Sequence, residues 1–377
     1  MKIKLFATCT FGLEAVVKRE LERLNMDNIV TSDGRIDFTG DFSSIAKANI
    51  WLRSADRVMI NFGEFDAFSF EDLFQGVKKL PWGDILEKDA NFIVTGKSVR
   101  SQLFSVSDCQ AITKKAIVEK LKEKYNIDWF EETGVQYKIQ VAILKDRVTI
   151  AIDTTGPGLN KRGYRETAVT APLKETLAHA LIDLSYWNKS RILADTMCGS
   201  GTIPIEAAMM ARNIAPGLTR QFAAENWTQI NTKIWLDARE EAFAAKDSTV
   251  KVQIHGSDID PRAIEQAKHN ARLAGVGDMI NFENLPAADY KASGEYGVLI
   301  SNPPYGSRIG DFGEIKELYY GLKRFLGANP SWSLYLLTAD EEIEKYLNKR
   351  ATKKRKLYNG NMKTDYYQFV GPRPPKG

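Results

Sequence analysis

The C-terminal half of this 377-residue chain contains apolar segments separated by helical stretches, and this pattern limits the possible folds more than any other feature. The segments are "RILAD", "VKVQIHGSD", "GVLISN" and "SWSLYLLTA". Strands that are apolar almost throughout and alternate with helices are typical of parallel sheets covered on both faces. The sequence therefore predicts an α/β domain after about residue 170. The last segment, "KLYNGNMKTDYYQFV", predicts that antiparallel strands complete its sheet.

The first 155 residues have a different organisation, in which short strands and amphipathic helices indicate α+β units. Strict alternation on both sides of Lys145 and Asp146 predicts a β-hairpin. We divide the chain into an N-terminal unit (1–64), a second α+β unit (65–155), a turn-rich linker (156–170) and the α/β domain (171–377). Several domains also agree with a chain that is too long for one ordinary core.

Composition argues against membrane, secreted and metal proteins. The chain is 44% apolar and 27% charged, and it has no apolar run of the ~18 residues that a membrane span needs. Three cysteines and three histidines are scattered, so they give no metal-ligand spacing and suit a reducing compartment. We therefore expect a cytoplasmic protein without a metal site. The net charge of +4 only weakly favours an anionic partner.

A glycine-rich turn, "DTMCGSGT", follows the predicted strand "RILA" and leads into a helix that begins near Thr202. Glycines at such a turn let a ligand approach the backbone, and the helix N-terminus offers unpaired N–H groups. The next acid at a strand end is Asp258, much farther on than the ~20 residues of a dinucleotide fold. The turn therefore indicates a nucleoside site without a pyrophosphate. A plain tight turn, and a helix cap at Asp258, are the alternatives.

A second unusual loop, "SNPPYGSR", follows the apolar run "GVLI". Two consecutive prolines end a strand, because each lacks an N–H group and fixes its own φ. Asn302 and Tyr305 therefore belong to a stiff loop. Taken alone, Asn302 could be a turn asparagine and Tyr305 a packing aromatic.

The combination of "DTMCGSGT", "GSDID" and "SNPPY", each at the end of a predicted parallel strand, resembles the class I S-adenosylmethionine-dependent methyltransferases that modify exocyclic amines. The segments "GKSVRSQLFSVSDCQ", "DTTGPGLNKRGYRE" and "TAPLKETLA", in this order, are similar to those of THUMP-containing RNA methyltransferases, and within them to the guanine-N2 methyltransferases of 23S ribosomal RNA. The resemblance covers nearly the whole chain. It implies a Rossmann-like seven-stranded methyltransferase domain preceded by ferredoxin-like and THUMP modules.

The resemblance also implies which residues bind S-adenosylmethionine and the target amine. The expected cofactor contacts are Asp195, Thr196, Cys198, Gly199, Ser200, Gly201, Thr202, Asp258 and Ile259. The expected catalytic residues are Asn302, Pro303, Pro304 and Tyr305. Thr196 departs from the proline that family members often carry, and we expect the change to be tolerated because the turn does not require proline.

The chemistry of the second loop agrees with this assignment. An exocyclic amine on a purine is a poor nucleophile, so acceptors for both of its N–H groups would help to direct its lone pair toward a methyl donor. The side-chain oxygen of Asn302 and the carbonyl of Pro303 are suitable acceptors, and the prolines fix their geometry. Tyr305 would offer an aromatic face to a base that has left its stack.

The basic clusters of the chain suggest contacts with RNA, whose affinity for proteins is mostly backbone electrostatics. The candidate phosphate contacts are Lys97, Arg100, Lys161, Arg162 and Arg165. Any one of these side chains could instead be solvated surface. Arg162 and Arg165 could also line the cofactor pocket, because they lie just before "TAPLKETLA".

The sequence thus predicts an enzyme that methylates guanine N2 in RNA, with 23S ribosomal RNA as the expected substrate. Adenine-N6 methylation of RNA or DNA is the nearest alternative, because "NPPY" suits any planar amine. Methylation of a glutamine side chain shares the loop but does not explain an RNA-type N-terminal module. A non-catalytic RNA-binding or assembly factor is the alternative from another class, and the intact "NPPY" argues against it. The sequence gives no oligomeric state.

Overall fold

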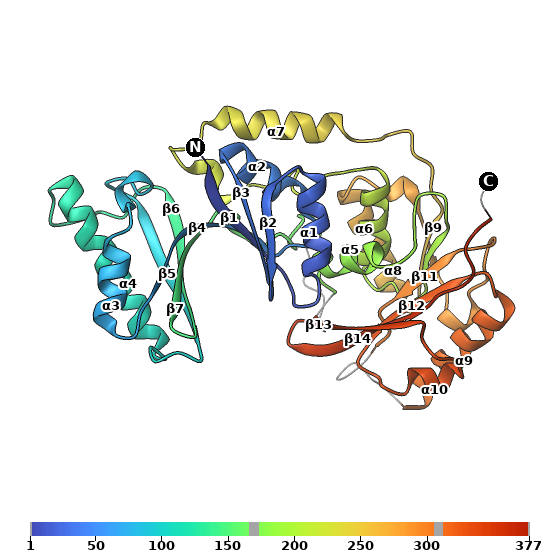
Figure 1. Ribbon diagram of the computed structural model, residues 1–377. Helices are drawn as coiled ribbons and strands as arrows, with labels where there is room; N and C mark the ends of the chain where they lie inside the picture. Colours follow the sequence, from blue (N-terminus) through green and yellow to red (C-terminus); the bar gives the residue numbers. More distant parts are fainter. Residues whose placement is uncertain (1, 166–172, 305–311, 376–377) are drawn as a thin grey trace.

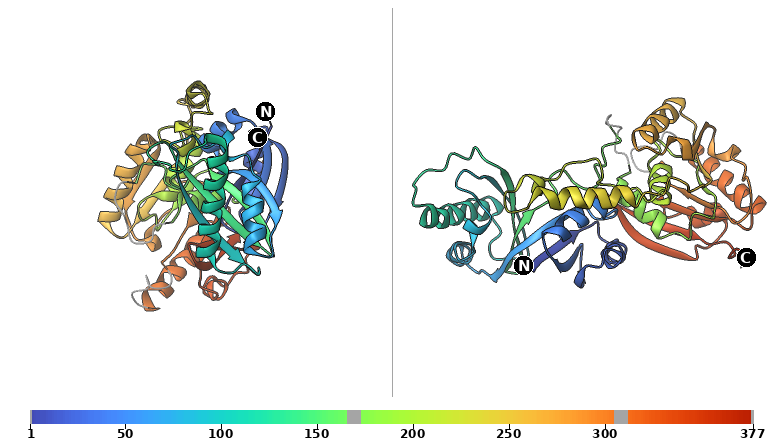
Figure 2. Two further views of the ribbon diagram at one scale, coloured as in Figure 1. Left: turned by 90° about the vertical axis from the view of Figure 1, so that its left-hand side faces the viewer. Right: turned by 90° about the horizontal axis from the view of Figure 1, so that it is seen from above.

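The computed structural model describes residues 2–165, 173–304 and 312–375. It contains two seven-stranded sheets, which occupy opposite ends of an elongated molecule (Figures 1 and 2). Helices cover both sheets, so the fold is α/β after an α+β N-terminal half, as predicted. In the described part of the chain, none of the helices combines the length and the apolar character that crossing a membrane requires.

The first sheet is formed by the N-terminal half of the chain. Its strands, in spatial order, are β2 (Asp27–Ser32), β3 (Arg35–Gly40), β1 (Ile3–Thr8), β4 (Arg57–Asp66), β7 (Arg147–Asp153), β6 (Gln136–Leu144) and β5 (Asn91–Val99). Its helices are α1 (Glu14–Arg23), α2 (Phe42–Trp51), α3 (Phe70–Lys78) and α4 (Val106–Tyr125). The predicted hairpin joins β6 and β7, and both turn residues, Lys145 and Asp146, have positive φ.

Strand β4 belongs to both N-terminal units. Residues 57–60 of β4 pair with β1 on one side, and residues 59–66 pair with β7 on the other side. The predicted boundary between residues 64 and 65 therefore falls inside a strand. The ferredoxin-like unit and the second unit are consequently parts of one continuous sheet.

The second sheet has the predicted parallel core and antiparallel end. Its strands, in spatial order, are β10 (Ile280–Asn284), β9 (Ile254–Asp258), β8 (Leu193–Asp195), β11 (Val298–Ser301), β12 (Ser333–Thr338), β14 (Met362–Phe369) and β13 (Lys353–Asn359). The first five are parallel, and β14 is antiparallel to both of its neighbours. The helices of this domain are α5 (Glu175–Asp183), α6 (Thr202–Ala211), α7 (Thr232–Ala244), α8 (Pro261–Leu273), α9 (Phe312–Ala328) and α10 (Ile343–Leu347). Every residue of β11 and β12 is buried, which explains their apolar sequences.

Residues 213–245, which we call the arm, leave the second domain after α6 and lie against the first sheet and its helices. Helix α7 in the arm lies beside α2, as Figures 1 and 2 show. The N–H groups of Gly217 and Ala224 donate to the carbonyls of Ile50 and Thr154, at 2.9 and 3.1 Å. The ring of Trp227 stacks on Tyr137 of β6 with 4.9 Å between ring centroids. The arm therefore joins the two domains over a buried contact.

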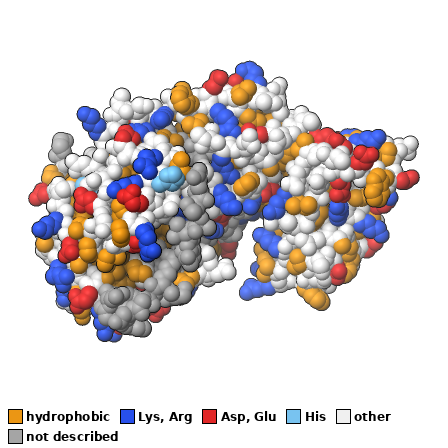
Figure 3. Space-filling model, turned by 180° about the vertical axis from the view of Figure 1, so that it is seen from behind, with side chains coloured by type: hydrophobic (Ala, Val, Ile, Leu, Met, Phe, Trp, Pro, Cys, Tyr) orange, Lys and Arg blue, Asp and Glu red, His pale blue; other side chains and the backbone are white. Residues whose placement is uncertain are grey.

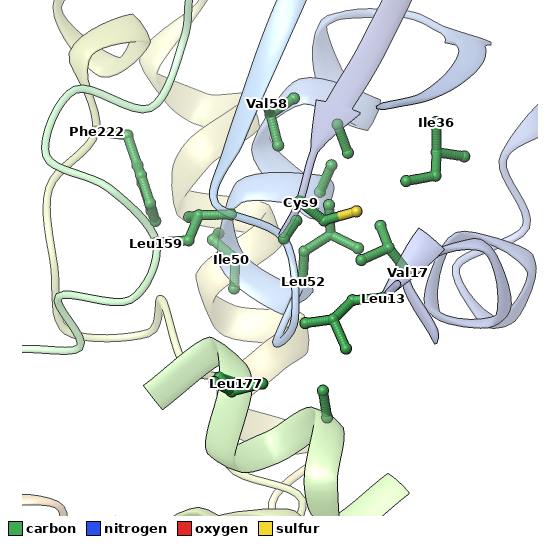
Figure 4. Packing of buried hydrophobic residues seen from close by; sticks show 14 of the residues in the cluster. Cys9, Leu13, Val17, Ile36, Ile50, Leu52, Val58, Leu159, Leu177 and Phe222 are labelled. Atoms are coloured by element: carbon green, nitrogen blue, oxygen red, sulfur yellow. The ribbon is translucent and has the colours of Figure 1, made fainter. Parts of the chain in front are cut away.

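One cluster of buried apolar side chains extends from the N-terminal unit into the second domain. Figure 4 shows Leu13 of the N-terminal unit close to Leu177 of α5, with Leu159 and Phe222 completing the packing. Leu159 belongs to the predicted linker, and only 1% of it is exposed. The linker thus contributes the buried side chains of Leu159, Arg162 and Tyr164, while Pro157, Lys161 and Gly163 are exposed. Cutting the chain near residue 160 would therefore expose apolar surface around Leu159.

Candidate active site

The site lies where the strand order of the second sheet changes direction. The chain runs from β8 outward to β9 and β10, and then returns to β11 on the other side of β8. In open parallel sheets, ligands bind outside the carboxyl ends of the strands at such a point. Asp195, Asp258 and Ser301 are the last residues of β8, β9 and β11, so the three predicted motifs meet at one edge.

A hydrogen-bonded pair, Asp195 and Ser301, connects the glycine-rich turn to the "NPPY" loop. The Ser301 hydroxyl donates to Asp195 Oδ1 at 2.6 Å and accepts from the N–H of Thr196 at 3.2 Å. Asp195 Oδ1 also accepts from the N–H of Met197. Burial raises the pKa of Asp195 to about 7, and the negative charge of Asp258 adds to the effect. The sequence analysis missed Ser301, although its place directly before Asn302 was a usable signal.

Asp258 supports the glycine-rich turn from the neighbouring strand. Its Oδ2 accepts from the N–H of Gly199 at 2.8 Å, and its Oδ1 accepts from the N–H of Asp260 at 3.0 Å. The cap of α8 is Asp260, whose side chain accepts from the N–H of Arg262. The alternative interpretation of Asp258 as a helix cap is therefore wrong.

The glycines of the turn are there for two different reasons. Gly201 has a φ of +83°, and a Cβ at this position would lie 2.9 Å from the Cβ of Ala267, so close packing requires glycine. Gly199 has a φ of +52°, and a Cβ there would meet no atom within 4 Å. The space beside Gly199 is thus open to a ligand, as expected for a turn that approaches one closely.

The remaining predicted cofactor residues surround this turn. Cys198 is buried, which raises the pKa of its thiol, and the hydroxyl of buried Thr196 has no partner in the described part of the chain. The carbonyl of Ser200 accepts from Asn270 Nδ2 at 3.0 Å. Thr202 begins α6, as predicted, and Ile259 is 72% exposed beside Asp258. The motif residues thus lie together around one turn.

Asn302 is the one polar residue of the "NPPY" loop that the structure describes. Its Oδ1 atom is buried and has no hydrogen-bond partner among the described residues. Leaving such an acceptor unpaired costs about 1–3 kcal/mol, whereas a turn asparagine would bond to nearby backbone. Pro303 is buried and Pro304 is exposed, and Tyr305 lies outside the described residues. The oxygen of Asn302 is therefore suited to accept a hydrogen bond from a ligand.

The prediction that Arg162 contacts RNA phosphate is wrong. Its side chain is buried, with Nε and Nη2 each 3.4 Å from the carboxylate of Glu206, and Nη1 donates to the carbonyl of Leu159 at 2.7 Å. A guanidinium that is enclosed and neutralised in this way cannot contact RNA. The ion pair could not be predicted from the basic run "NKRGYRE", because Glu206 lies 44 residues away in the sequence.

The contacts of Arg165 agree with the alternative prediction that this residue lines the cofactor pocket. Its Nη2 donates to the Thr202 hydroxyl at 2.7 Å, and its Nη1 lies 3.4 Å from the carboxylate of Glu175. The other three predicted phosphate contacts, Lys97, Arg100 and Lys161, are exposed. Lys97 lies on β5, the edge strand of the first sheet, and these three contacts stay predictions.

Comparison with known proteins assigns a family to each part of the chain. Residues 4–59 match the RlmL ferredoxin-like domain, residues 67–153 match the THUMP domain, and residues 162–368 match the RMKL-like methyltransferase domain. A protein of Bacillus subtilis strain 168, provisionally named the RNA methyltransferase YpsC, is 44% identical over 98% of this chain and 96% of its own.

Two solved structures are similar over nearly their whole length. One, from Listeria monocytogenes and described as a predicted N6-adenine-specific DNA methylase, has 49% identity and a TM-score of 0.95, and the match covers 99% of this chain and 97% of the other. The second, SMU.472, is provisionally described as a methyltransferase and was solved in complex with SAH. It has 43% identity and a TM-score of 0.94, over 99% of both chains.

Proposed function

Since the chain belongs to the family of RMKL-like methyltransferases, we propose that it transfers a methyl group from S-adenosylmethionine to the exocyclic N2 amine of a guanine in RNA, with 23S ribosomal RNA as the substrate. The observation that carries the proposal is the buried oxygen of Asn302, which has no partner among the described residues and lies at the same sheet edge as Asp195 and Asp258.

The edge formed by β8 and β9 has the features that S-adenosylmethionine requires. Open space beside Gly199 admits a ligand to the backbone, and the carboxylate of Asp258 keeps acceptor capacity for ribose hydroxyls after its two backbone contacts. The complex of SMU.472 with SAH supports the same cofactor here. When bound, the cofactor would supply a methyl group on a positively charged sulfur; its transfer to the amine nitrogen would break the S–C bond, leave SAH and release one amine proton to solvent.

The residues at the start of the "NPPY" loop orient the amine. Asn302 Oδ1 and the carbonyl of Pro303 accept one N–H group each, which directs the nitrogen lone pair toward the cofactor edge. Burial of Asn302 Oδ1 and of Pro303 keeps water from competing for these bonds. Tyr305 provides the stacking face for the flipped base.

The N-terminal half supports RNA as the substrate. The THUMP match, the RlmL-type ferredoxin-like unit and the name of the Bacillus relative all agree with an RNA-binding module in front of the catalytic domain. The resemblance of the sequence motifs to those of the guanine-N2 methyltransferases favours guanine N2 in 23S ribosomal RNA. The description of the Listeria protein as an N6-adenine methylase favours a second candidate, adenine N6, because two hydrogen-bond acceptors suit either amine.

Mass spectrometry of nucleosides from a deletion strain tests the proposal. We expect N2-methylguanosine in 23S ribosomal RNA to fall relative to the parent strain, and to return with the wild-type gene but not with the Asn302→Ala gene. Loss of N6-methyladenosine instead would establish the second candidate. An unchanged set of modified nucleosides in all RNA and DNA would contradict both.

A further inference from the structure

The turn Gly156–Gly158, directly after the first sheet, is held by two arginines from different parts of the chain. Arg57 of β4 donates through Nη1 to the carbonyl of Gly156. Arg220 of the arm donates through Nη1 to the carbonyl of Gly158 at 2.9 Å and through Nη2 to that of Pro157. Two guanidinium groups therefore donate hydrogen bonds to three consecutive backbone carbonyls.

The positive charge at this turn is only partly compensated. Arg57 forms an ion pair with Asp153, and the half-buried Asp56 carboxyl also lies within its electrostatic reach. Arg220 has no ion pair with a carboxylate among the described residues. Lys161, an exposed residue whose backbone N–H donates to the carbonyl of Gly158 at 3.0 Å, brings a third cationic residue to the same turn. Burial, together with the positive charges of Arg162 and Arg57, lowers the pKa of Arg220 to about 10, so it stays charged at neutral pH.

Arg220 is also fixed in position before any ligand binds. Its guanidinium carbon lies 4.9 Å from the centroid of the Phe222 ring, and its two carbonyl contacts set the plane of the group. A planar, pre-oriented guanidinium with remaining N–H donors suits a phosphate better than a mobile lysine does. These contacts leave part of its donor capacity for an anion.

The turn lies between the RNA-binding module and the cofactor edge. It follows β7 of the first sheet, and a few residues later the chain reaches Arg165, which contacts Thr202 at the start of α6. Figure 3 shows Lys and Arg side chains gathered at the waist between the two lobes of the molecule. A nucleic-acid strand that reached from the first sheet to the active site would pass this waist.

We propose that Arg57, Lys161 and Arg220 form a phosphate-binding site that holds the RNA backbone between the THUMP module and the active site. The proposal rests on the proposed function, because it takes RNA as the substrate. Arg57 and Arg220 come from segments more than 160 residues apart, so the site exists only when the arm is packed on the first sheet.

The test measures binding of in vitro transcribed 23S ribosomal RNA at several KCl concentrations. Arg220→Gln should weaken binding several-fold at ~100 mM KCl and reduce the slope of log affinity against log salt by about 0.7–0.9, the value for one lost phosphate contact. The apparent KM for RNA should rise, while the affinity for S-adenosylmethionine and the single-turnover rate at saturating RNA stay unchanged. The matched control is Lys233→Gln, which removes one charge from an exposed residue of the same arm and should leave the slope as it is.

Lys161→Glu is the second variant, because Arg220→Gln also removes two contacts to the turn. The Lys161 side chain is exposed, so reversal of its charge should not affect folding, and it should weaken RNA binding most at low salt. An unchanged salt slope in folded Arg220→Gln, or unchanged binding by Lys161→Glu, would overturn the site. If the wild-type enzyme binds and methylates RNA and these variants have the same RNA affinity and salt slope, the proposed phosphate site is wrong and the proposed function stands. If the wild-type protein bound no RNA, both proposals would fail.

Discussion

The cofactor side and the amine side of the active site differ in how their polar groups are satisfied. Asp195 and Asp258 each accept two hydrogen bonds from the surrounding protein, and Ser301 both donates and accepts. On the other side, Asn302 Oδ1 is buried without a partner among the described residues. The two carboxylates and the Ser301 hydroxyl are therefore paired within the protein, whereas the described residues offer the Asn302 oxygen no partner and leave it available to a ligand.

This difference implies that the two sides can be disabled separately. Groups that are already paired hold the shape of the cofactor turn, so their loss should affect cofactor affinity and stability. A buried acceptor without a partner does not stabilise the free protein and acts when the substrate arrives, so its loss should affect the chemical step. The following predictions test this separation.

The largest effect is expected from Asn302→Ala. Removing the acceptor leaves the amine without orientation, so single-turnover methyl transfer should fall by at least ~100-fold, as misplacement of a reacting group by an ångström can cause. The dissociation constant for S-adenosylmethionine, measured by calorimetry, should stay the same. Near-normal transfer would mean that the asparagine only shapes the turn.

Asp258→Ala should weaken cofactor binding by roughly 1.5–3 kcal/mol, because a carboxylate that accepts from ribose hydroxyls and from the N–H of Gly199 is lost. Calorimetry measures the change directly. Asp260→Asn is the matched control, since this neighbouring acid caps α8 and its substitution should leave cofactor affinity unchanged. Equal affinity in wild type and Asp258→Ala would remove Asp258 from the cofactor site.

Ser301→Ala should lower the free energy of unfolding by about 1–3 kcal/mol, because it leaves buried partners on Asp195 and Thr196 without their hydrogen bonds. Urea denaturation measures this loss. Cofactor affinity and methyl transfer should both fall modestly, because Ser301 connects the two loops. A large loss of transfer with normal stability and cofactor affinity would instead place the hydroxyl at the substrate.

The last prediction concerns the pH dependence of stability. The pKa of Asp195 is about 7 in the folded protein and about 4 in an unfolded chain, so the folded state binds this proton more tightly. The free energy of unfolding should therefore fall as pH rises from about 4 to about 7. Asp195→Asn keeps an acceptor for Ser301 and should make this fall shallower than in wild type. Parallel curves for the two proteins would show that Asp195 does not titrate in this window.

The motifs at the strand ends could be predicted because local chemistry determines them. Proline stops a strand, glycine permits positive φ, and apolar strands identify a parallel sheet, so Asp195, Asp258 and Asn302 were found before their meeting point was known. The hairpin at Lys145 and Asp146 was predictable for the same reason.

Features that depend on distant partners could not be predicted. The sequence of β4 does not show that the strand pairs with both units, so the sequence suggested a boundary at residue 64. Arg162 was assigned to RNA because nothing near it in the sequence pointed to Glu206. The sequence showed that the segment between the first two motifs is much longer than in a dinucleotide fold, but its packing on the first sheet depends on contacts such as that between Trp227 and Tyr137.

The arm and the shared strand β4 have a consequence for the choice of target nucleotide. Because the arm is packed on the first sheet and the core is continuous, the THUMP module and the "NPPY" loop are held in place relative to one another. If the proposed function holds, we expect the modified base to be the one that lies at the matching distance along the RNA from the element that the THUMP module binds. Lengthening the RNA between these two points should present a neighbouring nucleotide to Asn302, or none.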